Sequence, residues 1–131
     1  MKIETTFKIS IIASCALLLV YWFAPWFYGY LDSETQQILS WGGYKSALSV
    51  QNWFWNIFLF FSIISYVGIF LLRKVFRTLF LVIVISSLAL SSVSGMSVIT
   101  GFEVLIIDAS TMLNGFIIAI AYFSELKSKF Y

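Results

Sequence analysis

The 131-residue sequence contains no histidine, a single cysteine and a single proline. Without histidine the chain lacks the usual general base of enzymes and a ligand of common Cys/His zinc sites. Cys15, as the only cysteine, has no partner for a disulfide within the chain. A glycine-rich phosphate loop is also missing. These absences predict a protein that is not an enzyme and that holds no metal or other cofactor.

Charged residues are scarce as well. They make up 11% of the chain, against 61% hydrophobic residues, and the mean hydropathy is +0.97. A soluble domain has about a quarter charged residues. The net charge of only +2, divided among short segments, does not indicate a nucleic-acid partner. The composition predicts an all-α, polytopic protein whose apolar surface faces the lipid bilayer.

Four long apolar runs predict four transmembrane helices in one domain, residues 1–131, at approximately residues 9–31, 50–72, 76–95 and 103–124. A helix rises 1.5 Å per residue, so about 20 residues cross a hydrocarbon core of about 30 Å. Pro25 is expected to kink or end the first helix near its outer end.

The basic residues predict the orientation of these spans. Short loops rich in Lys and Arg remain on the cytoplasmic side of a membrane. Seven of the eight basic residues fall on one side of the predicted topology: Lys2 and Lys8 before the first span, Arg73, Lys74 and Arg77 between the second and third, and Lys127 and Lys129 after the fourth. We therefore expect a multi-pass membrane protein with both termini in the cytoplasm.

The first apolar run also resembles a signal peptide, because Lys2 and Lys8 precede it. Residues 12–15 even resemble a lipoprotein cleavage site. In a lipoprotein the residues after the cysteine would be polar. Here the apolar run continues past Cys15 to about Leu31. We expect this segment to be retained as a span.

The one substantial connection, residues 32–49, is expected on the outer, periplasmic side. Ser33 and Gln36 fit a capping box, in which Ser33 would be the N-cap of a short helix. This helix is predicted to run through Trp41 and to stop at Gly42-Gly43.

Asp108 is the most distinctive polar residue, because it lies inside the fourth predicted span. An acid in a span usually faces the bundle interior or a water-filled cavity. Helical spacing places it on a stripe with Gly115 and Ala119, a small-residue pair that permits close helix packing. Two interpretations follow: an ion, proton or substrate site, or a hydrogen bond or ion pair between helices.

The third span has a comparable stripe of small residues. Ser87, Ser91 and Gly95 repeat at four-residue spacing. We interpret them as a helix-packing face rather than a polar conduction path.

All five tryptophans map to the outer half of the predicted bundle. They indicate either an aromatic belt at the membrane interface or a belt combined with a docking surface for a protein partner. Lys45, the only outer cation, can pair with an outer acid or remain solvated. The candidate partner-binding residues are Trp41, Tyr44, Lys45, Trp53, Trp55 and Asp108.

In length, span number and small extramembrane parts, the chain resembles the small four-span immunity proteins of the bacterial inner membrane. Its C-terminal run, Asn114-Gly115 through Ala121-Tyr122-Phe123-Ser124 and then Lys129-Phe130, looks like the endings of small four-span bacterial proteins. The resemblance implies a non-enzymatic protein that binds a pore-forming protein toxin in or at the outer half of the bilayer.

Two other functions fit the same architecture. The chain resembles small multidrug resistance transporters in size and topology, but it has no acid between Ile9 and Leu31, where they carry a glutamate. An ion-coupled transporter or channel component would instead use Asp108. The third alternative is an accessory subunit of a larger membrane complex. All three candidate functions are compatible with a homo-oligomer.

Overall fold

The computed structural model describes residues 3–39, 52–95 and 97–131, and these residues form only helices, turns and loops. Four helices are long and apolar enough to cross a membrane, at the places in the sequence where spans are expected. In chain order the elements are α1 (Ile3–Phe23), η1 (Ala24–Tyr30, a 3-10 helix), α2 (Ser33–Leu39), α3 (Asn52–Phe70), α4 (Lys74–Val93), α5 (Gly101–Phe123) and η2 (Glu125–Lys129, a 3-10 helix).

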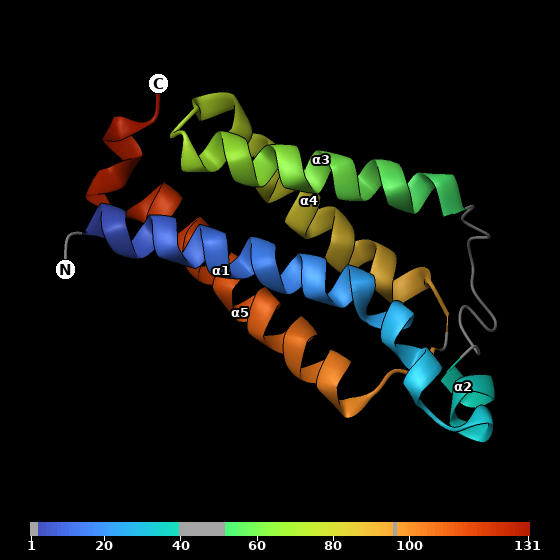
Figure 1. The fold of residues 1–131 in the computed structure, drawn as a ribbon. Coiled ribbons are helices and arrows are strands. Elements are labelled where there is room, and N and C mark those ends of the chain that lie inside the picture. The colour runs from blue at the N-terminus through green and yellow to red at the C-terminus, as the bar shows by residue number, and fades with distance from the viewer. Residues whose placement is uncertain (1–2, 40–51, 96) are drawn as a thin grey trace.

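The four long helices pack as two pairs. α1 lies along α5, and α3 lies along α4, while contact between the pairs is more limited. Figure 1 shows α3 moving away from α1 and α5 toward the end where α3 begins. The described helices are therefore held together most closely at the opposite end, near the α3–α4 turn.

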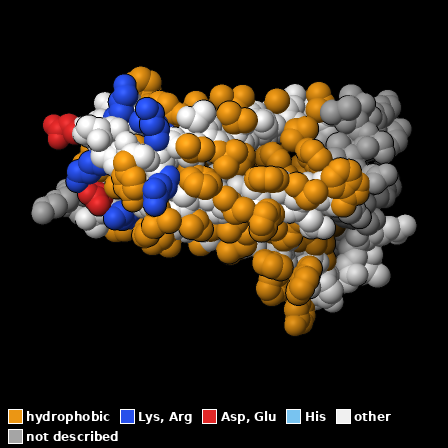
Figure 2. Space-filling model, turned by 90° about the horizontal axis from the view of Figure 1, so that it is seen from above, with side chains coloured by type: hydrophobic (Ala, Val, Ile, Leu, Met, Phe, Trp, Pro, Cys, Tyr) orange, Lys and Arg blue, Asp and Glu red, His pale blue; other side chains and the backbone are white. Residues whose placement is uncertain are grey.

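The two ends of the molecule differ in charge. Figure 2 shows the described Lys and Arg side chains gathered at one end, with hydrophobic side chains along the length of the molecule. This basic end carries Lys8, Arg73, Lys74, Arg77, Lys127 and Lys129. The other end, the aromatic end, carries Trp22 and Trp26 from α1 and η1 and Trp53 and Trp55 from the start of α3.

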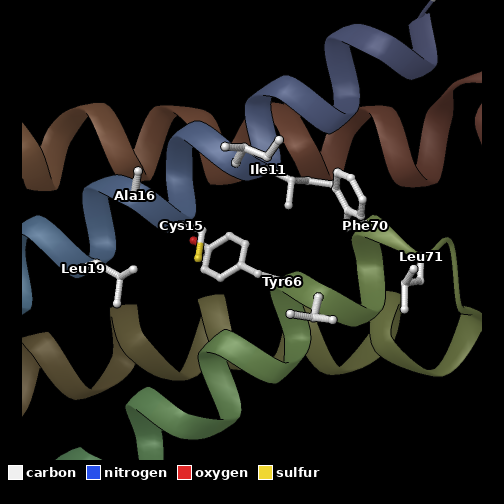
Figure 3. Close-up of a pocket in the computed structure, with 9 residues that line it drawn as sticks. Ile11, Cys15, Ala16, Leu19, Tyr66, Phe70 and Leu71 are labelled. Carbon is white, nitrogen blue, oxygen red and sulfur yellow. The ribbon is translucent and has the colours of Figure 1, made fainter.

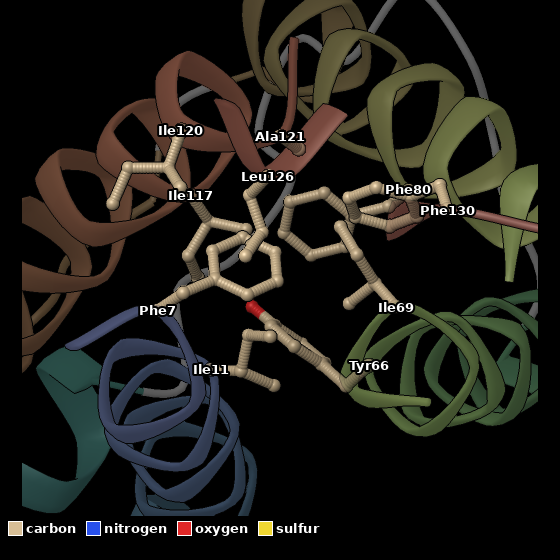
Figure 4. Close-up of a cluster of buried hydrophobic side chains, with 10 residues drawn as sticks. All are labelled: Phe7, Ile11, Tyr66, Ile69, Phe80, Ile117, Ile120, Ala121, Leu126 and Phe130. Carbon is tan, nitrogen blue, oxygen red and sulfur yellow. The ribbon is translucent and has the colours of Figure 1, made fainter. Parts of the chain in front are cut away.

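The hydrophobic core lies toward the basic end, and every long helix contributes to it (Figure 4). η2 and the residue after it supply Leu126 and Phe130, which are 1% and 8% exposed. The ring of Phe130 meets that of Phe7 edge-on at 6.1 Å between centroids. The complete buried cluster is Phe7, Ile11, Tyr66, Ile69, Phe80, Ile117, Ile120, Ala121, Leu126 and Phe130.

Polar contacts fix the C-terminal segment in this position. Glu4 accepts hydrogen bonds from Lys8 at 3.0 Å and Lys129 at 2.6 Å. The Tyr131 backbone oxygen accepts from the Lys74 N–H at 2.8 Å, and its own N–H donates to Leu72 at 3.1 Å. The segment that follows the fourth span therefore closes the basic end of the bundle.

The α3–α4 turn is tight and has an unusual residue at its centre. The N–H of Arg73 donates to the carbonyl of Gly68 and that of Leu72 to Ile69, the pattern of a Schellman cap. Leu72 occupies the left-handed position with φ of 57°, which costs a non-glycine residue about 1–2 kcal/mol. Its side chain packs against the core cluster, and this contact offsets the strain.

The start of α1 departs from expectation. α1 begins at Ile3 rather than near residue 9, because the charged residues Glu4 and Lys8 pair one turn apart and extend it. At the other end α1 stops at Phe23, and Pro25 stands in the first turn of η1. The expectation that Pro25 ends or kinks the helix is confirmed.

The expected cap of α2 is also wrong. Asp32, not Ser33, is the N-cap, because its carboxylate accepts the Thr35 N–H at 2.9 Å and the Thr35 hydroxyl at 2.6 Å. Gln36 donates its side-chain amide to the Leu31 carbonyl at 2.7 Å. The expected continuation to Trp41 and the stop at Gly42-Gly43 lie outside the described residues.

Candidate functional site: a polar cavity among the four long helices

A cavity of about 300 Å³ lies among the four long helices. Leucine, isoleucine, valine and phenylalanine side chains form much of its wall, but hydroxyl and amide groups from all four helices reach it. These polar lining residues are Tyr21, Ser62, Ser65, Tyr66, Ser87, Ser91, Ser110, Thr111 and Asn114. The gathering of these polar groups in a chain that is 61% hydrophobic makes this cavity the candidate binding site.

Two residues that line the cavity, Tyr66 and Asn114, belong to a hydrogen-bonded group that joins three helices. Asn114 Oδ1 of α5 accepts from the Ser14 hydroxyl of α1 at 2.7 Å and from the Tyr66 hydroxyl of α3 at 2.8 Å. The Ser14 and Tyr66 oxygens also lie 2.9 Å apart. Ser14 is fully buried and Tyr66 is 5% exposed. Side-chain bonds between membrane helices hold the helices in register, so this group fixes α1, α3 and α5 together.

The serines of the cavity wall mostly use their hydrogens on their own helices. Ser62 donates to the Phe58 carbonyl at 2.8 Å, Ser87 to Val84 at 2.8 Å and Ser91 to Leu88 at 2.8 Å. A hydroxyl has one hydrogen and two acceptor lone pairs. The wall therefore offers oxygen lone pairs, and it suits a ligand that brings hydrogen-bond donors.

A buried carboxylate stands one turn before the cavity-lining residues of α5. Glu103 is 3% exposed, and its Oε2 accepts from the Thr100 N–H at 2.7 Å and the Thr100 hydroxyl at 2.8 Å. Its Oε1 accepts from the Tyr28 hydroxyl of η1. Glu103 therefore completes the capping box of α5, whose N-cap is Thr100, and ties α5 to η1. Its lone pairs are largely occupied.

Sequence reasoning missed this role of Glu103. The signal was present, because Thr100 and Glu103 have the spacing of a capping box directly before an apolar run. The partnership with Tyr28, 75 residues earlier, has no local signal.

Asp108 does not face the bundle interior as expected. It is exposed, it is not among the cavity-lining residues, and no described residue forms an ion pair with it. Gly115 and Ala119 on the same stripe are exposed too, and a Cβ at Gly115 would meet nothing within 4 Å. The stripe points outward because α5 buries a different side. The buried residues on that side include Glu103, Ile106, Ile117 and Ile120. Close packing of another helix against Gly115 and Ala119 stays a prediction.

The other candidate residues divide among several places. Ser87 and Ser91 line the cavity, whereas Gly95 follows the end of α4 with φ of 80°. Trp53 is 59% exposed and Trp55 half-buried, in the first turn of α3. Trp41, Tyr44 and Lys45 lie outside the described residues.

The arrangement supports binding by hydrogen bonds and shape rather than by charge. Apart from Glu103 near its end, no acidic or basic side chain of the described chain stands at the cavity. The described residues also contain no cluster of three metal-ligating side chains. Two of the lining residues, Tyr66 and Phe80, also belong to the hydrophobic core cluster, so the cavity meets the core at these side chains (Figure 4).

Comparison with known proteins adds no family: no family model, curated protein or solved structure matches the chain.

Proposed function

We propose that this protein is a non-enzymatic binding protein of the bacterial inner membrane that neutralises a membrane-acting, pore-forming protein toxin. The observation that carries the proposal is the acceptor-lined cavity among the four long helices, which meets the packed hydrophobic core at Tyr66 and Phe80. A cavity of this kind suits capture of a ligand from one side better than passage of a solute across the membrane.

The partner segment is an apolar helix that carries a few hydroxyl, amide or tryptophan N–H donors. Its apolar side chains would contact the aliphatic wall, and its donors would meet the lone pairs of Ser62, Ser87 and Ser91. A donor without a partner costs free energy in a lipid environment, so such pairing favours the bound state. Binding in this way would sequester a segment that the toxin needs for its pore.

The aromatic end extends this contact surface. Trp55 forms an aromatic cluster with Phe54 and Phe58, with centroid distances of 5.5 to 6.4 Å, and Phe58 reaches the cavity wall. Rigid aromatic side chains lose little entropy on binding and are frequent in protein-binding hot spots. Trp53 contacts Phe54 of this cluster, and Trp41, Tyr44, Lys45 and Asp108 remain candidate contact residues.

The proposed orientation places the basic end in the cytoplasm and the aromatic end at the periplasmic face. It is supported by the gathering of all described Lys and Arg residues at one end, because cytoplasmic loops are enriched in these residues. Reporter fusions test it: a cytoplasmic reporter fused after Tyr131 should be active, and a periplasmic reporter at the same position inactive.

The function is tested by co-expression with the toxin encoded beside this protein's own gene. Cells that make both proteins should keep their membrane potential, measured with a potential-sensitive dye, and cells that make the toxin alone should lose it. Equal depolarisation with and without this protein, at matched toxin levels, would refute the proposal.

A further inference from the structure

A second, apolar groove runs between α1 and α3 (Figure 3). Its volume is about 430 Å³, and it is separate from the polar cavity, although Tyr66 borders both. Ile12, Ala16, Val67 and Leu71 along it are exposed, so the groove opens to the lipid side of the bundle. Its lining is Ile11, Ile12, Cys15, Ala16, Leu19, Tyr66, Val67, Phe70 and Leu71.

The groove has the length of one acyl chain in one leaflet. From Ile11 to Leu19 it follows α1 for eight residues, or about 12 Å at 1.5 Å per residue. Half of a bilayer's hydrocarbon core is about 15 Å thick. An extended acyl chain can therefore lie in the groove with its headgroup at the basic end.

Positive charge stands at that end of the groove. Lys8 continues the α1 stripe that lines it, and the Lys8 Nζ lies 5.5 Å from the centroid of the Phe70 ring. Glu4 is shared by Lys8 and Lys129, so one carboxylate faces two ammonium groups. Arg73 follows the lining residue Leu71 by two positions and stacks on Tyr131, with no ion pair to a described acid.

We propose that this groove binds one acyl chain of an anionic phospholipid, whose phosphate group lies between Lys8 and Arg73. The long apolar wall selects a lipid over a free anion, and the excess of cations selects an anionic headgroup over a zwitterionic one. The site is independent of the proposed immunity function.

The test measures lipid retention in mild detergent by native mass spectrometry, with phosphatidylglycerol and phosphatidylcholine of identical chains. Two variants address the two halves of the site. Ala16→Trp fills the groove, with Ala119→Trp on the exposed side of α5 as its matched control. Lys8→Gln removes the headgroup contact, with the exposed Lys127→Gln as its control. Thermal unfolding of each variant without lipid verifies that it folds.

The expected result is preferential retention of phosphatidylglycerol by the unaltered protein and by both control variants. Lys8→Gln should weaken phosphatidylglycerol retention about fivefold, the equivalent of about 1 kcal/mol for one lysine near an anionic surface. Ala16→Trp should reduce retention of both lipids. Equal retention of the two lipids by the unaltered protein, or unchanged retention in folded Ala16→Trp, would overturn the proposal.

Discussion

At the scale of the residue, a few polar side chains with defined hydrogen-bond partners join the helices of a mostly apolar bundle. Asn114, Ser14 and Tyr66 join three helices by hydrogen bonds between their side chains. Glu103 joins η1 to the start of α5. Asp108, which stands out in the sequence, has no partner among the described residues. The position of a polar residue in a span therefore does not show which way its side chain points.

Asn114→Leu should destabilise the bundle, because it removes the acceptor shared by Ser14 and Tyr66 and leaves both hydroxyls with fewer partners. The expected loss is about 1–2 kcal/mol, the upper range for hydrogen bonds between membrane helices. The measurement is reversible unfolding in mixed micelles. Asn56→Leu, at an exposed position of α3, serves as the control and should change stability little.

The N-cap of α2 should respond to acid. Hydrogen bonds from the Thr35 side chain and backbone lower the pKa of Asp32 below its ordinary value. A carboxyl group whose pKa is lowered by folding stabilises the folded form above its unfolded pKa of about 3.9 and loses this effect as pH falls through the folded pKa. The start of α2 should therefore loosen below about pH 4, seen as faster hydrogen exchange of the Thr35 amide. Asp32→Asn should keep the cap and abolish the pH dependence; an unchanged dependence would contradict this assignment.

At the scale of the element, α3 and α4 approach each other closely at Gly68. A Cβ placed on Gly68 would lie 2.0 Å from the ring of Phe76, closer than any side chain permits. The packing therefore requires glycine at position 68. The sequence instead suggested Gly115 as a packing residue, but a Cβ at Gly115 would have no atom within 4 Å. Both glycines precede an aliphatic or aromatic stretch, so the sequence alone does not distinguish them.

Gly68→Ala should separate α3 from α4 and destabilise the protein by about 1–3 kcal/mol, the usual cost of overpacking. Gly115→Ala should be neutral or slightly stabilising, because alanine favours helix over glycine. Unfolding in mixed micelles distinguishes the two variants. In a double-mutant cycle with Phe76→Ala, Gly68→Ala should cost less stability when the Phe76 ring is absent, and strictly additive losses would argue against the close approach of Gly68 to Phe76.

At the scale of the whole molecule, the sequence predicts the number and order of the spans but not how they pack. Apolar residues cover all sides of these helices, so no amphipathic stripe separates the lipid-facing side from the protein-facing side. For this reason the sequence wrongly places the stripe of Asp108, Gly115 and Ala119 inside, and it does not predict the cavity with Asn114. The return of Leu126 and Phe130 into the core also lacks a sequence signal, because the segment is short and charged.

The central claim is that the polar cavity is where the toxin segment binds. Its most direct test is protection of the membrane potential, with the toxin co-expressed, by a matched pair of variants on α4. Ser87→Phe fills the cavity from its wall, while Ser92→Phe places the same side chain at an exposed position that does not line it. With both variants present in the membrane at the level of the unaltered protein, Ser87→Phe should lose protection and Ser92→Phe should keep it. Full protection by Ser87→Phe would contradict the claim.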